Sequence, residues 1–170
     1  MNLFSHTRQW LALIAVGCVA LLAFGIFYLQ EVVGLEPCPM CIVQRYALIL
    51  VALVAGVSAF LPQGIWRTGG LVKVGVIAGF GAFVAARQSL LQWNPPEVMS
   101  CGRDFYGMIE AFPLKRAIPM IFKGSGDCAA VDWSFLGLTI ANWSFLCFSG
   151  IVVITLLLLA KRASLPADAV

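Results

Sequence analysis

Four long apolar stretches constrain this chain more than any other feature. They cover residues about 10–29, 42–61, 70–92 and 141–160 of the 170 in the sequence. A helix rises about 1.5 Å per residue, so roughly 20 apolar residues cross the hydrocarbon core of a bilayer. The stretches are continuously apolar instead of alternating, which excludes a β-barrel. We therefore expect an all-α integral membrane protein, a bundle of four transmembrane helices in one domain over residues 1–170.

The composition agrees with lipid as the main solvent. Hydrophobic residues make up 61% of the chain and charged residues only 11%, against about 25% charged residues in soluble domains. The net charge is +3, yet Lys and Arg occur singly or in pairs between the apolar stretches. Because no basic stripe follows the path of a phosphate backbone, we expect no nucleic-acid partner.

The charged residues near the span ends predict how the chain threads the membrane. One side carries five cations, Arg8, Arg67, Lys73, Lys161 and Arg162. On the other side, a first loop at about 31–40 contains Glu31 and Glu36 but no Lys or Arg, and a long loop at about 94–140 mixes both signs. By the positive-inside rule, both termini are expected in the cytoplasm and both of these loops outside it.

Small residues in the third span predict close helix packing. Gly75 and Gly79 have the small-xxx-small spacing, and Ala78, Ala82 and Ala86 repeat that spacing on the adjoining row. Rows of this kind let a neighbouring backbone approach closely in a membrane. Chance occurrence of the spacing is the alternative.

The expected topology sorts the six cysteines before any motif is considered. Cys18 and Cys147 fall inside spans one and four, where a thiol usually serves as a small buried apolar group. The other four fall outside the cytoplasm, and they are Cys38, Cys41, Cys101 and Cys128. Disulfides persist in that compartment, so each outer loop holds a cysteine pair that is able to form one.

The pair Cys38-Pro-Met-Cys41 indicates redox chemistry rather than a structural bridge. A CxxC ring is tight, removes little chain entropy, and is the form that proteins use when the bond must open. We expect no metal, because the only histidine, His6, is on the opposite side and no histidine follows Cys41 as in haem attachment. A four-thiolate zinc site is the remaining metal alternative.

For Cys101 and Cys128, the residues alone leave two interpretations open. A structural bridge between them would close a loop of about 28 residues and stabilise it by roughly 3–4 kcal/mol. The stretch Gly124-Ser125-Gly126-Asp127 before Cys128 is instead suited to a flexible, accessible site. Thiol–disulfide exchange requires such an accessible sulfur.

Arg45 follows Cys41 by four residues, on the same face of span two and about one turn deeper. Cys41 itself stands where unpaired backbone N–H groups and the helix dipole favour a thiolate. Arg45 is therefore a candidate to stabilise that thiolate and to bind a carbonyl oxygen of a redox-active lipid, with Gln44 as a second donor. The alternative for Arg45 is an anchor that snorkels to the headgroups.

Together these residues resemble the DsbB family. The resemblance rests on Cys38-Pro-Met-Cys41-Ile-x-x-Arg45 at the start of span two, with Cys101 and Cys128 in the following long loop. The family pattern also matches Ser125-Gly126-Asp127-Cys128-Ala129, Trp133 and Phe135-Leu136-Gly137-Leu138. Span count, loop lengths and cysteine order agree over essentially the whole chain.

The resemblance implies an enzyme of the bacterial inner membrane that generates disulfide bonds. A soluble periplasmic DsbA-like thiol oxidase would attack Cys101 in a redox-active disulfide Cys101–Cys128. Electrons would then pass to a second redox-active disulfide, Cys38–Cys41. All four cysteines are catalytic in this picture, and both pairs lie on the periplasmic side.

The resemblance also implies a cofactor, a membrane quinone that takes the electrons to the respiratory chain. Ubiquinone and menaquinone are both compatible with it. The expected binding residues are Cys41, Arg45 and Gln44. Arg87 and Gln88, towards the outer end of span three, either approach the quinone or snorkel to the surface, and we leave them out of the predicted site.

The segment between the loop cysteines, about residues 105–122, is rich in apolar residues but interrupted by prolines and cations. It is expected to form a short interfacial helix on the membrane surface. Two other functions are considered. One is a quinone reductase similar to vitamin K epoxide reductase, in which the CxxC belongs near the end of the helical core. The other is a non-enzymatic membrane scaffold whose loop disulfides are structural.

Overall fold

The structure is a computed structural model that describes residues 3–35, 38–62, 64–94, 131 and 133–164. Cys101, Cys128 and the expected interfacial helix lie outside the described residues. The elements are, in chain order, α1 (Leu3–Ala23), the π-helix η1 (Phe24–Val32), α2 (Pro39–Phe60), α3 (Ile65–Trp93), β1 (Ser134–Phe135), β2 (Leu138–Thr139) and α7 (Ile140–Ala163).

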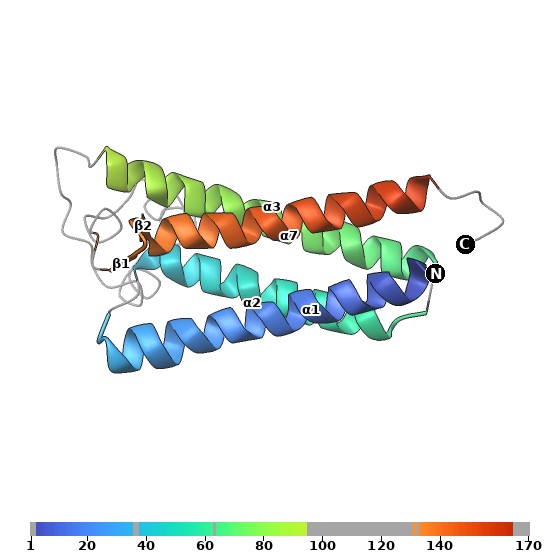
Figure 1. Cartoon of the computed structure of the whole chain (residues 1–170), viewed down its shortest axis with the longest axis horizontal. Coiled ribbons are helices and arrows are strands. Elements are labelled where there is room, and N and C mark those ends of the chain that lie inside the picture. Colours follow the sequence, from blue (N-terminus) through green and yellow to red (C-terminus); the bar gives the residue numbers. More distant parts are fainter. Residues whose placement is uncertain (1–2, 36–37, 63, 95–130, 132, 165–170) are drawn as a thin grey trace, which may run out of the picture.

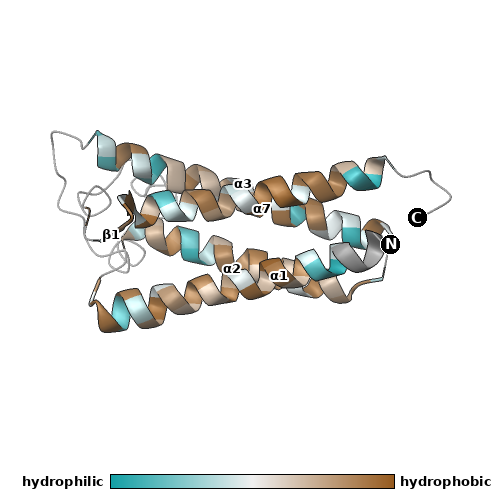
Figure 2. Cartoon of the chain, viewed as in Figure 1, coloured by the Kyte–Doolittle hydropathy of each residue, from teal (hydrophilic) through white to brown (hydrophobic). Residues whose placement is uncertain are grey.

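Four long helices run side by side along the molecule (Figure 1). Each is long and apolar enough to cross a membrane, and apolar residues dominate all four along most of their length (Figure 2). Large apolar side chains such as Val16, Phe83 and Leu157 point outward and are exposed. A surface of this kind faces lipid. The prediction of a four-span all-α membrane bundle is therefore confirmed.

The helices extend beyond the predicted spans. The first continues from residue 3 to 32 through α1 and η1, where 10–29 was expected, and α3 begins at Ile65 instead of near 70. The other two bounds differ by three residues or fewer, at 39–60 and 140–163. Hydropathy reports only the part inside lipid, whereas backbone hydrogen bonding continues a helix into the headgroup region. The apolar pattern therefore does not predict the polar first and last turns of these helices.

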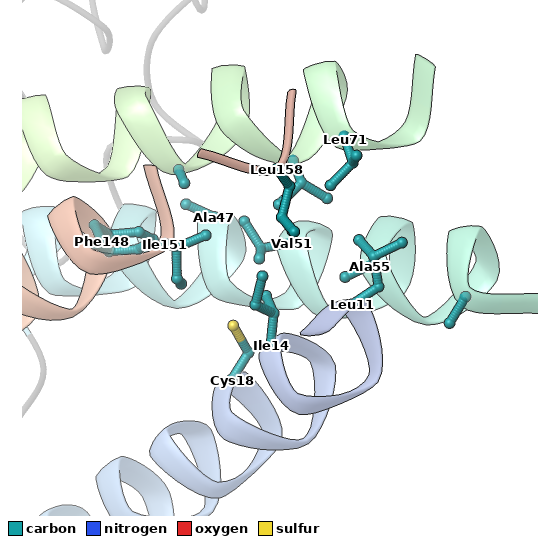
Figure 3. Packing of buried hydrophobic residues seen from close by; sticks show 13 residues of the cluster. Leu11, Ile14, Cys18, Ala47, Val51, Ala55, Leu71, Phe148, Ile151 and Leu158 are labelled. Atoms are coloured by element: carbon teal, nitrogen blue, oxygen red, sulfur yellow. The ribbon is translucent and has the colours of Figure 1, made fainter. Parts of the chain in front are cut away.

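The helices pack in the order α1–α2–α3–α7 around a central apolar core. Figure 3 shows side chains from all four helices meeting there. The buried core includes Leu11, Ile14, Cys18, Ala47, Val51, Ala55, Leu71, Val74, Ala78, Phe148, Ile151 and Leu158. Cys18 thus serves as a small buried apolar group, as expected.

Close approach on α3 occurs at one glycine of the predicted pair, Gly75, and at two glycines outside it. A Cβ atom added to Gly81 would lie 2.6 Å from Cζ of the buried Phe148, and one added to Gly70 would lie 2.6 Å from Cβ of Ser58. Gly75 does face Thr155, but a Cβ on Gly79 would meet nothing within 4 Å. The prediction for Gly79 is wrong because sequence spacing defines a row of residues without fixing which helix that row faces.

The two ends of the bundle differ in chemistry. At one end, α1 begins, α7 ends and the turn between α2 and α3 lies close by (Figure 1). There Arg67 Nη2 donates to Leu61 O at 2.6 Å, and Arg162 Nη1 donates to Gly64 O at 3.3 Å and to the Thr68 hydroxyl. The other end holds Cys38 and the β1–β2 hairpin. The start of α1 and the end of α7 therefore lie at one end of the bundle, and the cytoplasmic location of that end remains a prediction.

Candidate redox site

The first turn of α2 carries the two cysteines of the CxxC motif. Cys38 is the N-cap residue, with an extended backbone at φ −66° and ψ 159°, and Pro39 follows at the first helical position. Proline is well suited to that position because it lacks an N–H and its φ is already helical. The Cys38 sulfur accepts the backbone N–H of Cys41 at 3.3 Å, as a capping side chain does.

The same geometry brings the two sulfurs together. Cys38 Sγ and Cys41 Sγ lie 2.6 Å apart, with Cys38 buried and Cys41 partly exposed. The short separation comes from the local fold of one helical turn, so interchange between dithiol and disulfide requires no movement of one helix against another. Cys41 is the member of the pair that is accessible to a reactant.

One glutamine side chain contacts the cysteine pair and a second contacts the first, and both are 4% exposed. Gln88 on α3 donates from Nε2 to Cys38 Sγ at 3.3 Å and to Cys41 Sγ at 3.4 Å. Gln44 on α2 donates from Nε2 to Gln88 Oε1 at 2.7 Å. These contacts join α2 to α3 immediately beside the sulfurs.

Arg45 is held by the π-helical end of the first span. Its Nη1 donates to Gln30 Oε1 at 2.8 Å and its Nη2 to Gly25 O at 3.2 Å. Five residues separate Gly25 from Gln30, which in an α-helix, at roughly 100° per residue, would point them about 140° apart. The i→i+5 winding of a π-helix instead brings residues five apart back towards one face. The π-helix therefore presents both acceptors to the same guanidinium.

A cavity of about 350 Å³ opens beside Cys41. The polar part of its lining consists of Cys38, Cys41, Gln44, Arg45, Gln88, Gln92 and Ser144. The rest of the lining is mainly apolar and comes from the first, second and fourth spans and from the hairpin, including Leu21, Phe24, Leu29, Leu48, Ile140 and Phe148. A mostly apolar cavity with a few converging polar groups is the usual form of a small-molecule site.

Aromatic side chains form part of the lining of this cavity. Trp133 stacks on Phe135 at 6.1 Å between ring centroids and meets Phe24 edge-on at 6.4 Å. Trp143 donates from Nε1 to Phe135 O at 3.1 Å. Thr139, at the start of α7, donates to Gln92 Oε1 at 2.7 Å. These contacts hold the hairpin and Trp133 against η1 and against the neighbouring ends of α3 and α7.

The hairpin itself is an element that the sequence analysis did not predict. Ser134 pairs with Thr139 and Phe135 with Leu138. Leu136 and Gly137 form the turn with φ values of 53° and 77°. Two successive positive φ angles are typical of a type I′ hairpin turn, and glycine at the second position adopts one without strain.

The structure brings four of the predicted site residues to one cavity: Cys38, Cys41, Gln44 and Arg45. Arg87 is exposed, whereas its neighbour Gln88, which the predicted site left out, lies against both sulfurs. Gln30 was not considered at all. A polar residue inside a span should face protein rather than lipid, and that signal would have favoured both glutamines.

Comparison with known proteins decides the family. The family model described as "Disulfide bond formation protein DsbB" matches residues 7–158. The chain belongs to the DsbB family. A relative in Polaromonas naphthalenivorans named "Disulfide bond formation protein B" is 68% identical over 165 residues, covering 96% of this chain and 97% of the relative. Relatives with the same name in a second Polaromonas strain and in Paracidovorax citrulli are 69% and 63% identical, covering 92% and 94% of this chain and 92% and 90% of their own lengths.

Membership in the DsbB family gives the described site its chemistry. Proteins of this family form disulfide bonds by oxidising thiols, so this chain is a disulfide-forming oxidoreductase in a multi-pass membrane fold. A CxxC pair whose sulfurs adjoin at a helix N-terminus is the arrangement that such thiol–disulfide exchange uses.

Proposed function

We propose that this chain is a quinone-dependent protein-thiol oxidoreductase of the bacterial inner membrane. It reoxidises a soluble periplasmic DsbA-like dithiol protein and passes the electrons through two cysteine pairs to ubiquinone or menaquinone. Both termini lie in the cytoplasm and both cysteine pairs on the periplasmic side. The observation that carries the proposal is the largely apolar cavity of about 350 Å³ beside the Cys38–Cys41 pair.

The cavity lining suits a quinone. A quinone has an apolar ring, an apolar tail and two carbonyl oxygens that accept hydrogen bonds. The lining is mainly apolar, and within it Arg45 and Gln44 carry N–H donors. Arginine has five N–H groups, two of which bind Gln30 and Gly25, so donors remain for a carbonyl oxygen. Arg45, Gln44 and Cys41 are accordingly the residues proposed to hold the quinone headgroup.

The proposed relay balances electrons and protons at every exchange. A thiolate of the partner attacks Cys101 in the Cys101–Cys128 disulfide, and the partner's second thiol then releases the partner in its oxidised form. Two electrons and two protons now reside on Cys101 and Cys128. Exchange with the Cys38–Cys41 disulfide regenerates the loop disulfide and leaves the dithiol on Cys38 and Cys41.

The quinone is the final electron acceptor, because it takes up two electrons and two protons while Cys38 and Cys41 return to a disulfide. A pool of soluble thiols and disulfides cannot act as this acceptor. A DsbA-like partner has a reduction potential near about −120 mV, so a pool near roughly −200 mV lies about 80 mV too low, which is about 4 kcal/mol uphill for two electrons. An acceptor of higher potential inside the membrane meets this requirement.

The test is quinol formation by the purified full-length protein with quinone and a reduced DsbA-like dithiol. Wild type is expected to oxidise the dithiol only when quinone is present, measured by quinone absorbance. Cys41→Ser is expected to abolish this activity and Arg45→Ala to weaken it. Cys18→Ala, in the apolar core, is the matched cysteine control and is expected to retain it. No turnover with either quinone would refute the proposal and favour a scaffold with structural disulfides.

A further inference from the structure

Gln88 is an uncharged polar side chain buried where a membrane bundle normally holds apolar residues. Its amide is 4% exposed and lies between α2 and α3. Burial of an amide costs free energy unless its donors and acceptor are satisfied. The partners that satisfy Gln88 are the two sulfurs of the redox pair and the amide of Gln44. A residue whose hydrogen bonds end on reacting atoms is a candidate for a chemical role.

The nitrogen end of the Gln88 amide faces the two cysteine sulfurs. A glutamine amide has two N–H donors on nitrogen and a separate acceptor oxygen. Gln44 donates to that oxygen at 2.7 Å, so the nitrogen faces the cysteines, where its contacts to Cys38 Sγ and Cys41 Sγ measure 3.3 Å and 3.4 Å. The same oxygen accepts a longer bond from Cys41 Sγ at 3.9 Å. The short bond from Gln44 thus holds the Gln88 oxygen, and the Gln88 nitrogen makes the closer contacts with the sulfurs.

Two N–H donors affect the oxidised and reduced forms of the pair unequally. Disulfide sulfurs are neutral and weak acceptors, whereas a thiolate carries a full negative charge. Hydrogen bonds to a charged acceptor are about twice as strong as neutral ones. Arg45, a cation that lines the same cavity as Cys41, directs two of its N–H groups to Gln30 and Gly25. The Gln88 amide thus supplies donors in contact with the sulfur that becomes charged.

We propose that Gln88 is a catalytic residue that stabilises the Cys41 thiolate through its amide N–H groups, and that Gln44 is the positioning residue that orients it. The inference rests on the proposed function, in which Cys41 is the sulfur that meets the quinone. It adds Gln88 to the reacting site and gives Gln44 a role through Gln88. It predicts that the thiolate fraction of Cys41, and with it the ease of reducing the pair, depends on residue 88.

A purely structural role makes a different prediction. If the Gln44–Gln88 contact only joined α2 to α3, its loss would lower stability and leave the acidity of the cysteines unchanged. The decisive readout is therefore the pH profile of Cys41 alkylation. That profile reports the thiolate and does not depend on quinone.

The experiment uses reduced full-length protein in detergent. Iodoacetamide modification of Cys41 is followed against pH by mass spectrometry of the peptide that contains it. Gln88→Met keeps the side-chain length and removes both donors. The pH midpoint of Cys41 alkylation is therefore expected to rise by about one unit, which means a roughly tenfold loss of thiolate at any pH below the midpoint. Gln44→Met leaves the donors but frees their orientation, and a smaller rise is expected. Ser89→Ala, a buried polar change one residue along α3, is the control expected to match wild type.

A second variant keeps the inference testable if Gln88→Met does not fold. Gln88→Glu has the same shape and still accepts from Gln44, but it presents a carboxylate to the sulfurs, so the midpoint is expected to rise further. Equilibration with dithiothreitol gives an independent measure. Both variants are expected to make the Cys38–Cys41 disulfide harder to reduce, by about tenfold in the equilibrium constant.

The outcomes separate the inference from the proposed function. Unchanged midpoints in the Gln88 variants overturn the inference, even if the protein reduces quinone normally. Raised midpoints in a protein that shows no quinone-dependent turnover sustain the role of Gln88 towards the thiolate and refute the proposed function. Raised midpoints together with slower quinone reduction support both.

Discussion

Replacing Gly81 with alanine places a methyl group against Phe148, the aromatic residue of the described buried core. The added Cβ would lie 2.6 Å from Cζ and 2.7 Å from Cδ1 of Phe148, whose side chain is 0% exposed. Such distances require the ring or the helix to shift. Overpacking of this kind costs about 1–3 kcal/mol, while alanine in place of glycine gains up to roughly 1 kcal/mol of helix propensity.

Gly79→Ala is the matched control on the same helix, because a Cβ there meets nothing within 4 Å. The propensity gain is common to both variants, so their difference isolates the contact with Phe148. We expect Gly81→Ala to be less stable than Gly79→Ala by about 1–3 kcal/mol. Equilibrium unfolding in mixed micelles with increasing SDS, followed by circular dichroism, measures this difference.

Phe148 also lines the cavity beside Cys41, so the same substitution has a functional readout. A ring displaced into the cavity is expected to raise KM for quinone while oxidation of the dithiol at saturating quinone stays closer to normal. In a Phe148→Leu background the ring atoms nearest to Gly81 are absent. Gly81→Ala should then lower the free energy of unfolding by less than it does in the wild-type background. Equal stability of Gly81→Ala and Gly79→Ala, or no coupling to Phe148, would refute the packing argument.

Three further predictions concern single contacts. Arg45→Lys keeps the charge but loses the planar guanidinium that donates to both Gln30 Oε1 and Gly25 O. The KM for quinone in steady-state kinetics should therefore rise about tenfold, and an unchanged KM would contradict this prediction. Trp143→Phe removes the bond to Phe135 O, worth about 1 kcal/mol, and should speed amide exchange in the hairpin; unchanged protection would count against it. Thr155→Val should alter the free energy of unfolding by less than about 1 kcal/mol, because among the described residues its hydroxyl donates to carbonyls of its own helix at 2.8–3.0 Å. A larger loss would reveal another role.

The apolar pattern predicts the four helices because a bilayer imposes one length on every span. The CxxC position at the start of α2 follows from the same pattern combined with Pro39, which fits the first turn of a helix. Cys41 and Arg45 share a helix and are four residues apart, so their common direction was also predictable. These inferences depend only on local geometry within one span.

Contacts between spans were not predictable in this way. Arg87 and Gln88 differ by about 100° around α3, and only the packing of α3 on α2 determines that Gln88 turns inward and Arg87 outward. The close approach at Gly81, rather than at Gly79, has the same origin. The sequence analysis did not predict the β1–β2 hairpin because two-residue strands carry no periodic pattern. The residues of its turn are Leu136 and Gly137.

The winding of η1 has a consequence for how this protein tolerates changes in length. Gly25 and Gln30 both reach Arg45 because five residues complete a turn between them, not because of their side-chain types alone. Deleting any one residue from 26–29 would leave the two acceptors four residues apart, a spacing that an ordinary α-helix places about 40° apart on one face, with hydropathy almost unchanged. Between Phe24 and Val32, a change in residue count can therefore be matched by a change in winding, from five residues between the acceptors in a π-helix to four in an α-helix. Aligned sequences of this family should be read for gaps there as closely as for substitutions.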